Sequence, residues 1–185
     1  MKLFITISLL LSSLTMLGQN FHSEFEYVDS IHNGITIQNS YPRGGQRYTS
    51  PNGNEYVYVI FWTCITNESV SDLQLKIDFL PDSFTTPSAP NVNFNIYLPQ
   101  VVMELEKDSL YNYGLNLKLF LDANINKSSE LKTTIKPNDS YLFYTVAISN
   151  RGVNGVVRAG FELENQDLVY KINGYERTCG RIVIK

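Results

Sequence analysis

The stretch YVYVIFWTCITNES, residues 56–69, decides which fold class the sequence predicts. Side chains along an extended strand point alternately to its two faces. Here both sets are apolar: one holds Tyr56, Tyr58, Ile60, Trp62 and Cys64, and the other holds Val57, Val59, Phe61 and Ile65. Because such a strand must lose water on both sides, we expect it to lie in the middle of a layered structure.

A second run, YLFYTVAIS at 141–149, is also apolar on both faces, whereas the runs at 73–79 and 157–163 alternate with polar residues. One face of each two-sided run can pack on an opposing sheet, and something must cover the other. The candidate cover is the segment 81–130, in which the region 113–126 also fits the spacing of a short helix. Without that cover, an exposed aromatic face around Tyr56, Tyr58 and Trp62 would form a binding site.

Turn signals divide the chain into short segments. Asn-Gly pairs, which accept the positive φ angles of tight hairpins, occur at 33–34, 52–53, 154–155 and 173–174. We expect strands at 25–31, 35–39, 55–66, 72–79, 92–98, 131–135, 140–149, 155–164, 167–172 and 181–184. Many short strands with frequent turns predict an all-β, antiparallel β-sandwich with one short helix in the 113–126 region.

The N-terminal segment MKLFITISLLLSSLTMLGQN has one lysine before an apolar run, which is typical of a secretory signal peptide over residues 1–19. We expect cleavage near residue 19, which leaves a single domain over 20–185. The alternative is a membrane anchor, but the run is shorter than the roughly 20 residues that span a bilayer. The mature chain is therefore expected to be secreted or periplasmic, with no membrane span.

Composition narrows the possible functions. The formal net charge is −3, so we expect no nucleic-acid partner, which would require a basic face. The only histidines are His22 and His32, and the sequence has no nucleophile-elbow motif and no cluster of zinc ligands. We therefore expect no enzyme and assign no catalytic residue. The alternative is a secreted hydrolase that uses carboxylates such as those of Glu104 and Glu106.

The two cysteines, Cys64 and Cys179, are predicted to form a disulfide, because thiols that share a domain in an oxidising compartment most simply pair. Such a bond would join a central strand to the start of the last one. The alternative is two buried thiols, one within each sheet.

The loop SYPRGGQRYTSPNGNEY, residues 40–56, carries candidate ligand-binding residues. Tyr41, Arg43, Arg47 and Tyr48 combine aromatic faces with forked donors, a combination that suits a sugar or a carboxylate. The alternative is an ordinary strand connection with extended surface side chains.

The segment DANINKSSE, residues 122–130, places Asp122, Asn124 and Asn126 at a spacing of two, as in the first half of a calcium loop. Lys127 occupies the position of the turn glycine, which departs from that pattern. Calcium is the one cofactor that the sequence suggests, and the alternative is a polar helix end.

Two longer segments carry a family resemblance. YVYVIFWTCITNESVSDLQLKIDF and LKTTIKPNDSYLFYTVAI each place two strands around a short turn. In this arrangement the chain resembles the secreted immunoglobulin-like β-sandwich proteins of bacteria. The resemblance implies an immunoglobulin-like fold and an extracytoplasmic location, and it carries over no functional residues. It departs from true immunoglobulin domains because Trp62 and Cys64 share one strand.

These observations predict a binding or structural accessory module whose partner is a protein or a cell-surface glycan. Besides the hydrolase, a second alternative is a sorting role for the C-terminal tail GRIVIK, which resembles the basic and apolar ends of some secretion signals.

Overall fold

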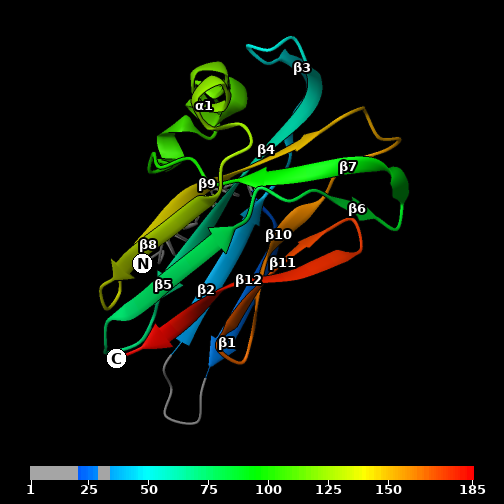
Figure 1. Ribbon diagram of the computed structural model, residues 1–185. Coiled ribbons are helices and arrows are strands. Elements are labelled where there is room, and N and C mark those ends of the chain that lie inside the picture. The colour runs from blue at the N-terminus through cyan, green and yellow to red at the C-terminus, as the bar shows by residue number, and fades with distance from the viewer. Residues whose placement is uncertain (1–20, 29–33) are drawn as a thin grey trace, which may run out of the picture.

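The computed structural model describes residues 21–28 and 34–185 and shows two antiparallel sheets packed face to face (Figure 1). Sheet A contains β1 (Phe21–Val28), β2 (Gly34–Ser40), β3 (Arg43–Thr49), β4 (Glu55–Asn67), β6 (Phe84–Thr86), β7 (Ala89–Tyr97) and β9 (Ser140–Ser149). Sheet B contains β5 (Leu73–Phe79), β8 (Ser129–Ile135), β10 (Ala159–Glu164), β11 (Asp167–Ile172) and β12 (Tyr175–Ile184). The predicted all-β sandwich is confirmed.

The two runs that are apolar on both faces are β4 and β9, and they pair with each other in the middle of sheet A. Their register runs from Val57 opposite Ser149 to Thr66 opposite Ser140. The inward side chains, among them Phe61, Ile65 and Phe143, join residues of sheet B in the core between the sheets. The faces that the sequence predicted for both strands are confirmed.

The outer face of β4 and β9 is covered by residues 98–128, the later part of the predicted cover 81–130, whereas its earlier part forms β6 and β7 of sheet A. The segment 98–128, called the cap below, contains the short 3-10 helices η1 (Leu105–Lys107) and η2 (Tyr111–Gly114) and helix α1 (Leu117–Asn124). Its buried side chains form a second hydrophobic cluster with the outward residues of the two strands: Met103, Tyr113, Leu115, Leu117 and Leu121 pack with Tyr58, Ile60, Trp62, Tyr144, Val146 and Ile148. The expected short helix is therefore present, and it forms part of the cover.

Other strand predictions need correction. The loop expected at 40–56 contains β3, which pairs with β4 and forms a hairpin closed by the turn at 50–54 (Figure 1). Tyr48 is the one buried residue of β3, so the strand lacks the alternation of apolar and polar residues by which a sequence predicts a strand. The short strand β6 was not expected, and β12 begins at Tyr175 rather than at 181. Part of the first predicted strand and the Asn33-Gly34 turn fall on residues 29–33, outside the described residues.

The Asn-Gly turns have different outcomes. Asn173 and Gly174 form the two-residue hairpin turn between β11 and β12, with φ angles of 44° and 82°. Asn154 and Gly155 lie instead in the loop 150–158, which crosses from β9 in sheet A to β10 in sheet B. The predicted strand at 155–164 therefore starts only at Ala159.

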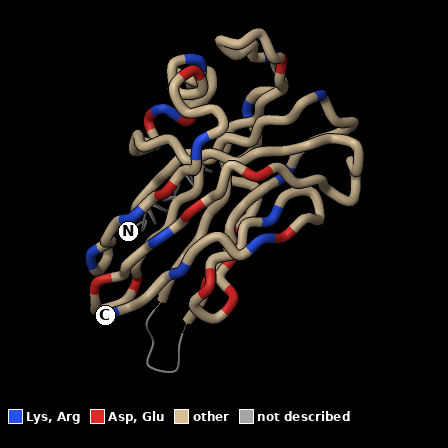
Figure 2. The backbone as a smooth tube through the Cα atoms, viewed as in Figure 1, with Lys and Arg blue, Asp and Glu red and all other residues tan. Residues whose placement is uncertain are grey.

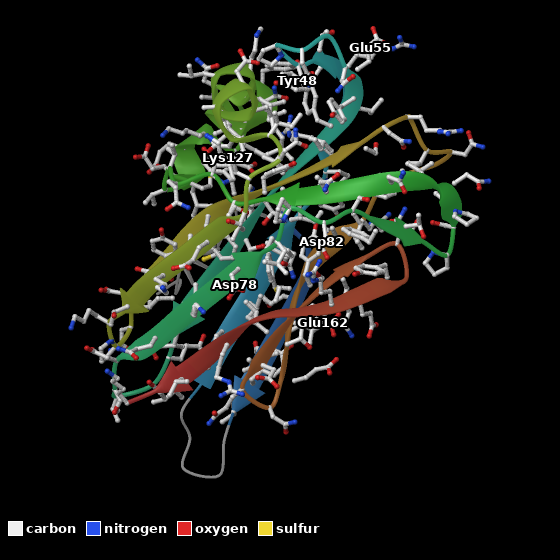
Figure 3. The ribbon with its side chains drawn as sticks, in the orientation of Figure 1. Tyr48, Glu55, Asp78, Asp82, Lys127 and Glu162 are labelled. Carbon is white, nitrogen blue, oxygen red and sulfur yellow. The ribbon has the colours of Figure 1, made fainter. Side chains whose placement is uncertain are left out.

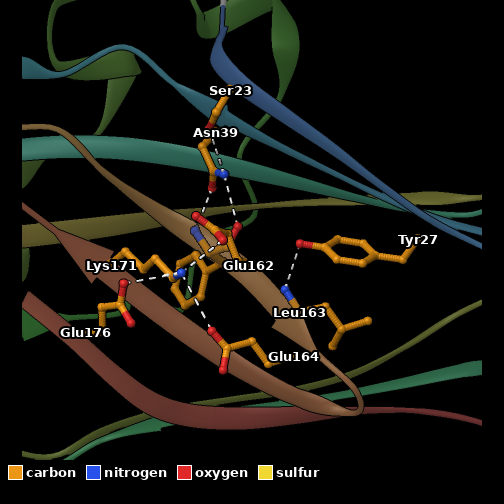
Figure 4. Close-up of polar contacts among 9 residues, drawn as sticks. Ser23, Tyr27, Asn39, Glu162, Leu163, Glu164, Lys171 and Glu176 are labelled. Atoms are coloured by element: carbon orange, nitrogen blue, oxygen red, sulfur yellow. Dashed lines mark hydrogen bonds and ion pairs between the residues drawn. The ribbon is translucent and has the colours of Figure 1, made fainter. Parts of the chain in front are cut away.

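Asn39 joins the two sheets along the edge of β10 (Figure 4). Its side-chain Oδ1 accepts from the Phe161 N–H at 2.9 Å, and its Nδ2 donates to the Phe161 carbonyl at 3.1 Å. The same amide contacts Thr63 and Ser23, so all of its hydrogen-bonding capacity is used although it is buried. Gly160 allows this approach, because a Cβ there would lie 2.5 Å from the Asn39 Cγ.

Basic and acidic residues are interspersed along the strands of sheet B (Figure 2). Lys171 lies among three carboxylates, those of Glu162, Glu164 and Glu176, at 3.1, 3.6 and 3.3 Å (Figure 4). The hydrogen bond to Glu162 is the main reason why the pKa of Lys171 is raised. Such mixed charge is typical of a solvated face.

The predicted disulfide between Cys64 and Cys179 is wrong. Both thiols are free and buried, and they belong to different hydrophobic clusters: Cys64 packs under the cap and Cys179 packs between the sheets. Burial raises the pKa of both thiols, that of Cys179 to about 12. The alternative of two buried thiols, one in each sheet, describes the structure.

The predicted signal peptide lies outside the described residues. Within residues 21–28 and 34–185, no helix has the length and apolar character that crossing a membrane requires. The tail GRIVIK belongs to β12, an inner strand of sheet B between β11 and β5.

Candidate functional site

A cleft of about 470 Å³ separates the β3–β4 hairpin from the cap. Figure 3 shows Tyr48 between the hairpin and helix α1, with Glu55 at the end of the hairpin. The cleft is lined mainly by polar and aromatic side chains: Gln46, Tyr48, Tyr58, Tyr111, Asn112, Asn116 and Lys118. We call this the hairpin–cap cleft. Its volume falls in the range of roughly 300–1,000 Å³ that is usual for small-molecule sites.

An unusual backbone turn forms one wall of the cleft. Asn112, Tyr113 and Gly114 are all left-handed, with φ angles of 51°, 54° and 70°. Left-handed tyrosine is strained, so its surroundings must hold it. Tyr113 is buried in the cap cluster, and its carbonyl accepts from the Tyr144 hydroxyl at 2.8 Å. Such strain concentrates at functional sites, which makes this turn the first place to look for a ligand.

Tyr111, directly before that turn, presents its ring to solvent. Tyr111 is 66 % exposed, which is high for a large side chain of mainly apolar surface. Its hydroxyl is nevertheless held, because it donates to Gln46 and lies 2.9 Å from the hydroxyl of buried Tyr58. The Asn112 amide donates to the same Tyr58 hydroxyl at 3.2 Å. Burial, followed by the hydrogen bond to Tyr111, raises the pKa of Tyr58.

The charged groups around the cleft are paired with one another. Arg47 lies 3.0 Å from Glu55, and Lys118 lies 2.6 Å from Asp122. The Asp122 carboxylate also accepts from the Tyr48 hydroxyl at 2.9 Å, which ties helix α1 to the hairpin. The bond to Lys118 and then the bond to Tyr48 lower the pKa of Asp122, and burial raises the pKa of Tyr48. The cleft therefore offers hydroxyl and amide groups, beside a fixed aromatic ring, to a neutral ligand.

The structure brings only some of the predicted binding residues to this site. Arg47, Tyr48 and Tyr58 line the cleft. Tyr56 stacks beside Tyr48 with ring centroids 6.3 Å apart, and Tyr41 lies outside the lining, 6.1 Å from the ring of His22.

Two further predicted binding residues, Arg43 and Trp62, contact the cap. Arg43 donates to the Asp108 carbonyl at 3.1 Å and lies over the Tyr113 ring, with its guanidinium carbon 5.1 Å from the centroid. Trp62 is buried and donates to the Asp108 carboxylate at 2.7 Å. The exposed aromatic face suggested for Tyr56, Tyr58 and Trp62 does not form, because the cap buries Tyr58 and Trp62.

The residues suggested for calcium lie at the end of helix α1 rather than in a loop. Asp122 and Asn124 are within the helix, and the Asn124 amide donates to the Phe120 carbonyl at 2.8 Å. Asn126 follows with a left-handed φ of 65°. Since the Asp122 carboxylate already binds Lys118 and Tyr48, this arrangement is the polar helix end given as the alternative. In the part of the chain that the structure describes, no three His, Cys, Asp or Glu side chains gather as a metal site.

The carboxylates suggested for a hydrolase do not face each other across this cleft. Glu104 forms an ion pair with Lys107 at 2.9 Å, and neither Glu104 nor Glu106 lines the hairpin–cap cleft. His22 donates from Nε2 to the Ala159 carbonyl at 2.9 Å, and His32 is outside the described residues.

Sequence reasoning missed Gln46, Tyr111, Asn112, Asn116 and Lys118 as cleft residues. The segment SLYNYGLN that supplies three of them has no motif, and its tyrosine, asparagine and glycine content was the only signal of a special turn.

In comparisons with known proteins, no family model, no curated protein and no solved structure matches this chain. The immunoglobulin-like resemblance therefore stays a prediction, and the functional argument rests on the site alone.

Proposed function

We propose that this protein is an extracytoplasmic binding module that recognises a neutral glycan in the hairpin–cap cleft. The observation that carries the proposal is the Tyr111 ring, which is exposed to solvent but held at its hydroxyl by Gln46 and Tyr58. A ring fixed in this way can stack on the apolar face of a sugar without losing much conformational freedom on binding.

The surrounding groups support the same ligand class. The amides of Gln46 and Asn116 and the hydroxyls of the tyrosines can donate to and accept from sugar hydroxyls. Lys118 at the rim is already paired with Asp122, so it gives little attraction to an anionic sugar. Neutral sugars therefore suit the cleft better than acidic ones.

A glycan array probed with the purified protein tests this proposal, followed by calorimetry on the sugars that bind. We expect Tyr111→Ala to weaken binding about fivefold, since the stacking contact contributes on the order of 1 kcal/mol. Tyr111→Phe should weaken it less, because the ring remains while its hydroxyl anchor is lost. Leu80→Ala, which changes an exposed side chain outside the cleft, is the control. Array binding that survives Tyr111→Ala unchanged would refute the proposal.

A protein partner is the second candidate, and one observation favours it. Among the described residues, six of the eleven exposed large apolar side chains lie in the cap: Val101, Val102, Leu105, Leu110, Tyr111 and Leu119. Such gathering is characteristic of interaction surfaces. If the partner binds there, Leu119→Lys should abolish its cross-linking to this protein and leave glycan binding intact.

A further inference from the structure

A second pocket lies on the opposite face of sheet A, where this sheet extends beyond sheet B. The pocket measures about 530 Å³, and residues of the loop 150–158 line one side of it. The other walls are the inward faces of β4 and β9 together with β3 and β7. We call it the inner pocket.

The inner pocket is lined mostly by apolar residues and glycines, and its polar lining residues are Arg43, Arg47 and Ser149. Its lining includes Val57, Val59, Phe94, Ala147, Val153 and Val157, and no aspartate or glutamate is among the lining residues. Val57, Val59 and Val153 are only partly buried, although the first two face the inside of the sandwich. Apolar inward side chains that protein atoms do not fully cover leave room for an apolar ligand.

Gly44 keeps this space open beside Val59, its partner across the strands. Its φ of +123° is a conformation that residues with side chains rarely adopt, and a Cβ would lie 2.6 Å from the Tyr58 carbonyl oxygen. Gly45 follows in the same bulge with a φ of +79°. Because glycine has no side chain, neither residue narrows the mouth of the pocket.

Arg47 supplies a charge at this mouth. It pairs with Val57 across β3 and β4 and therefore stands on the same face as the pocket. Its guanidinium donates once, through Nη1, to Glu55 at 3.0 Å. A guanidinium carries five N–H donors, so most of them stay free for a second acceptor. The pair with Glu55 is exposed, with 77 % and 61 % of the two side chains accessible, and such pairs are weak.

We propose that the inner pocket binds an aliphatic carboxylate, with its hydrocarbon chain against the valines and its carboxylate on Arg47. The proposal does not depend on glycan binding, because the valines of the inner pocket lie on the face of sheet A opposite to Tyr48 and Tyr58, although Arg47 borders both sites. A carboxylate fits the forked donors of arginine in a bidentate manner, which a neutral head group cannot match.

Calorimetry with decanoate and with decanol, both below the concentrations at which they aggregate, tests the proposal on the full purified protein. We expect saturable binding of decanoate. Arg47→Gln should weaken this binding about tenfold, because one charge-assisted contact is lost, and should leave the binding of decanol unchanged. Val153→Asp, on the loop, should abolish binding of both ligands. Lys136→Gln, which changes an exposed cation outside both sites, is the matched control and should change neither.

Circular dichroism and the fluorescence of Trp62 check that each variant is folded. If Val153→Asp does not fold, Val156→Asp replaces it, because that side chain also lines the pocket and Val156 is 61 % exposed. Absence of saturable decanoate binding would overturn the proposal, as would binding that neither the loop variant nor Arg47→Gln weakens. Equal effects of Arg47→Gln on decanoate and decanol would overturn the role of Arg47 and with it the assigned ligand class.

Discussion

Replacing Asn39 should destabilise the protein more than its small size suggests. In Asn39→Ala the Phe161 N–H and carbonyl both lose their partner, and both lie in the buried contact between the sheets. A buried group left without a hydrogen bond costs about 1–3 kcal/mol, so two cost about 2–6 kcal/mol. Water that enters the vacated space recovers part of this, and we expect a loss of about 2–5 kcal/mol. For a chain of this size that lowers the melting temperature by about 4–20 °C.

Urea unfolding followed by tryptophan fluorescence measures this loss, because Trp62 is the only tryptophan and is buried in the native state. Asn39→Asp, which keeps the volume but removes the amide donor and adds a buried charge, should be at least as destabilising. Gln38→Ala is the matched control: the neighbouring side chain bonds to Glu24 on the exposed surface and should cost within about 1 kcal/mol. A loss of less than about 1 kcal/mol for Asn39→Ala would refute the claim that this amide joins the sheets.

Three further predictions follow from single contacts. Because its folded pKa lies below the ordinary 3.8, Asp122 stabilises the protein above about pH 4, and this contribution is lost as the pH falls through the folded pKa; thermal melts of Asp122→Asn and the native protein should differ at pH 7, and the difference should shrink as the pH falls below about 4. Cys64 and Cys179 should react with a thiol reagent only after unfolding, and a reductant should leave the melting temperature unchanged; rapid labelling of the native protein would contradict their burial. Asn154 should deamidate before Asn52 or Asn173 in peptide maps of aged protein, because the Asn52 and Asn173 side chains each accept a hydrogen bond.

The sequence was sufficient to predict the layered β architecture, because burial on both faces of β4 and β9 is written directly in their apolar residues. The cover over the outer face could be inferred from the same fact, since an apolar face that large needs a partner. Strand β3 could not be predicted, because its residues RGGQRYT gain their extended shape from pairing with β4 and not from their own pattern.

The candidate site was only partly predictable for a related reason. Arg47 and Tyr48 stood out as residue types, but what they contact depends on where the cap lies, and a cap is placed by tertiary packing. Tyr111 and Asn112 belong to no motif, and the left-handed turn beside them is held by Tyr144 and Tyr58 from distant strands. The disulfide prediction failed because compartment and cysteine count say nothing about which face of a sheet each thiol occupies.

The most direct test of glycan recognition by the hairpin–cap cleft is a backbone amide shift map, recorded by NMR while a neutral oligosaccharide from the array is added. Recognition in the cleft predicts that the largest shifts fall on Gln46, Tyr111, Asn112 and Asn116, with sheet B unaffected. Shifts concentrated on the charged outer face of sheet B, or none at saturating sugar, would contradict it.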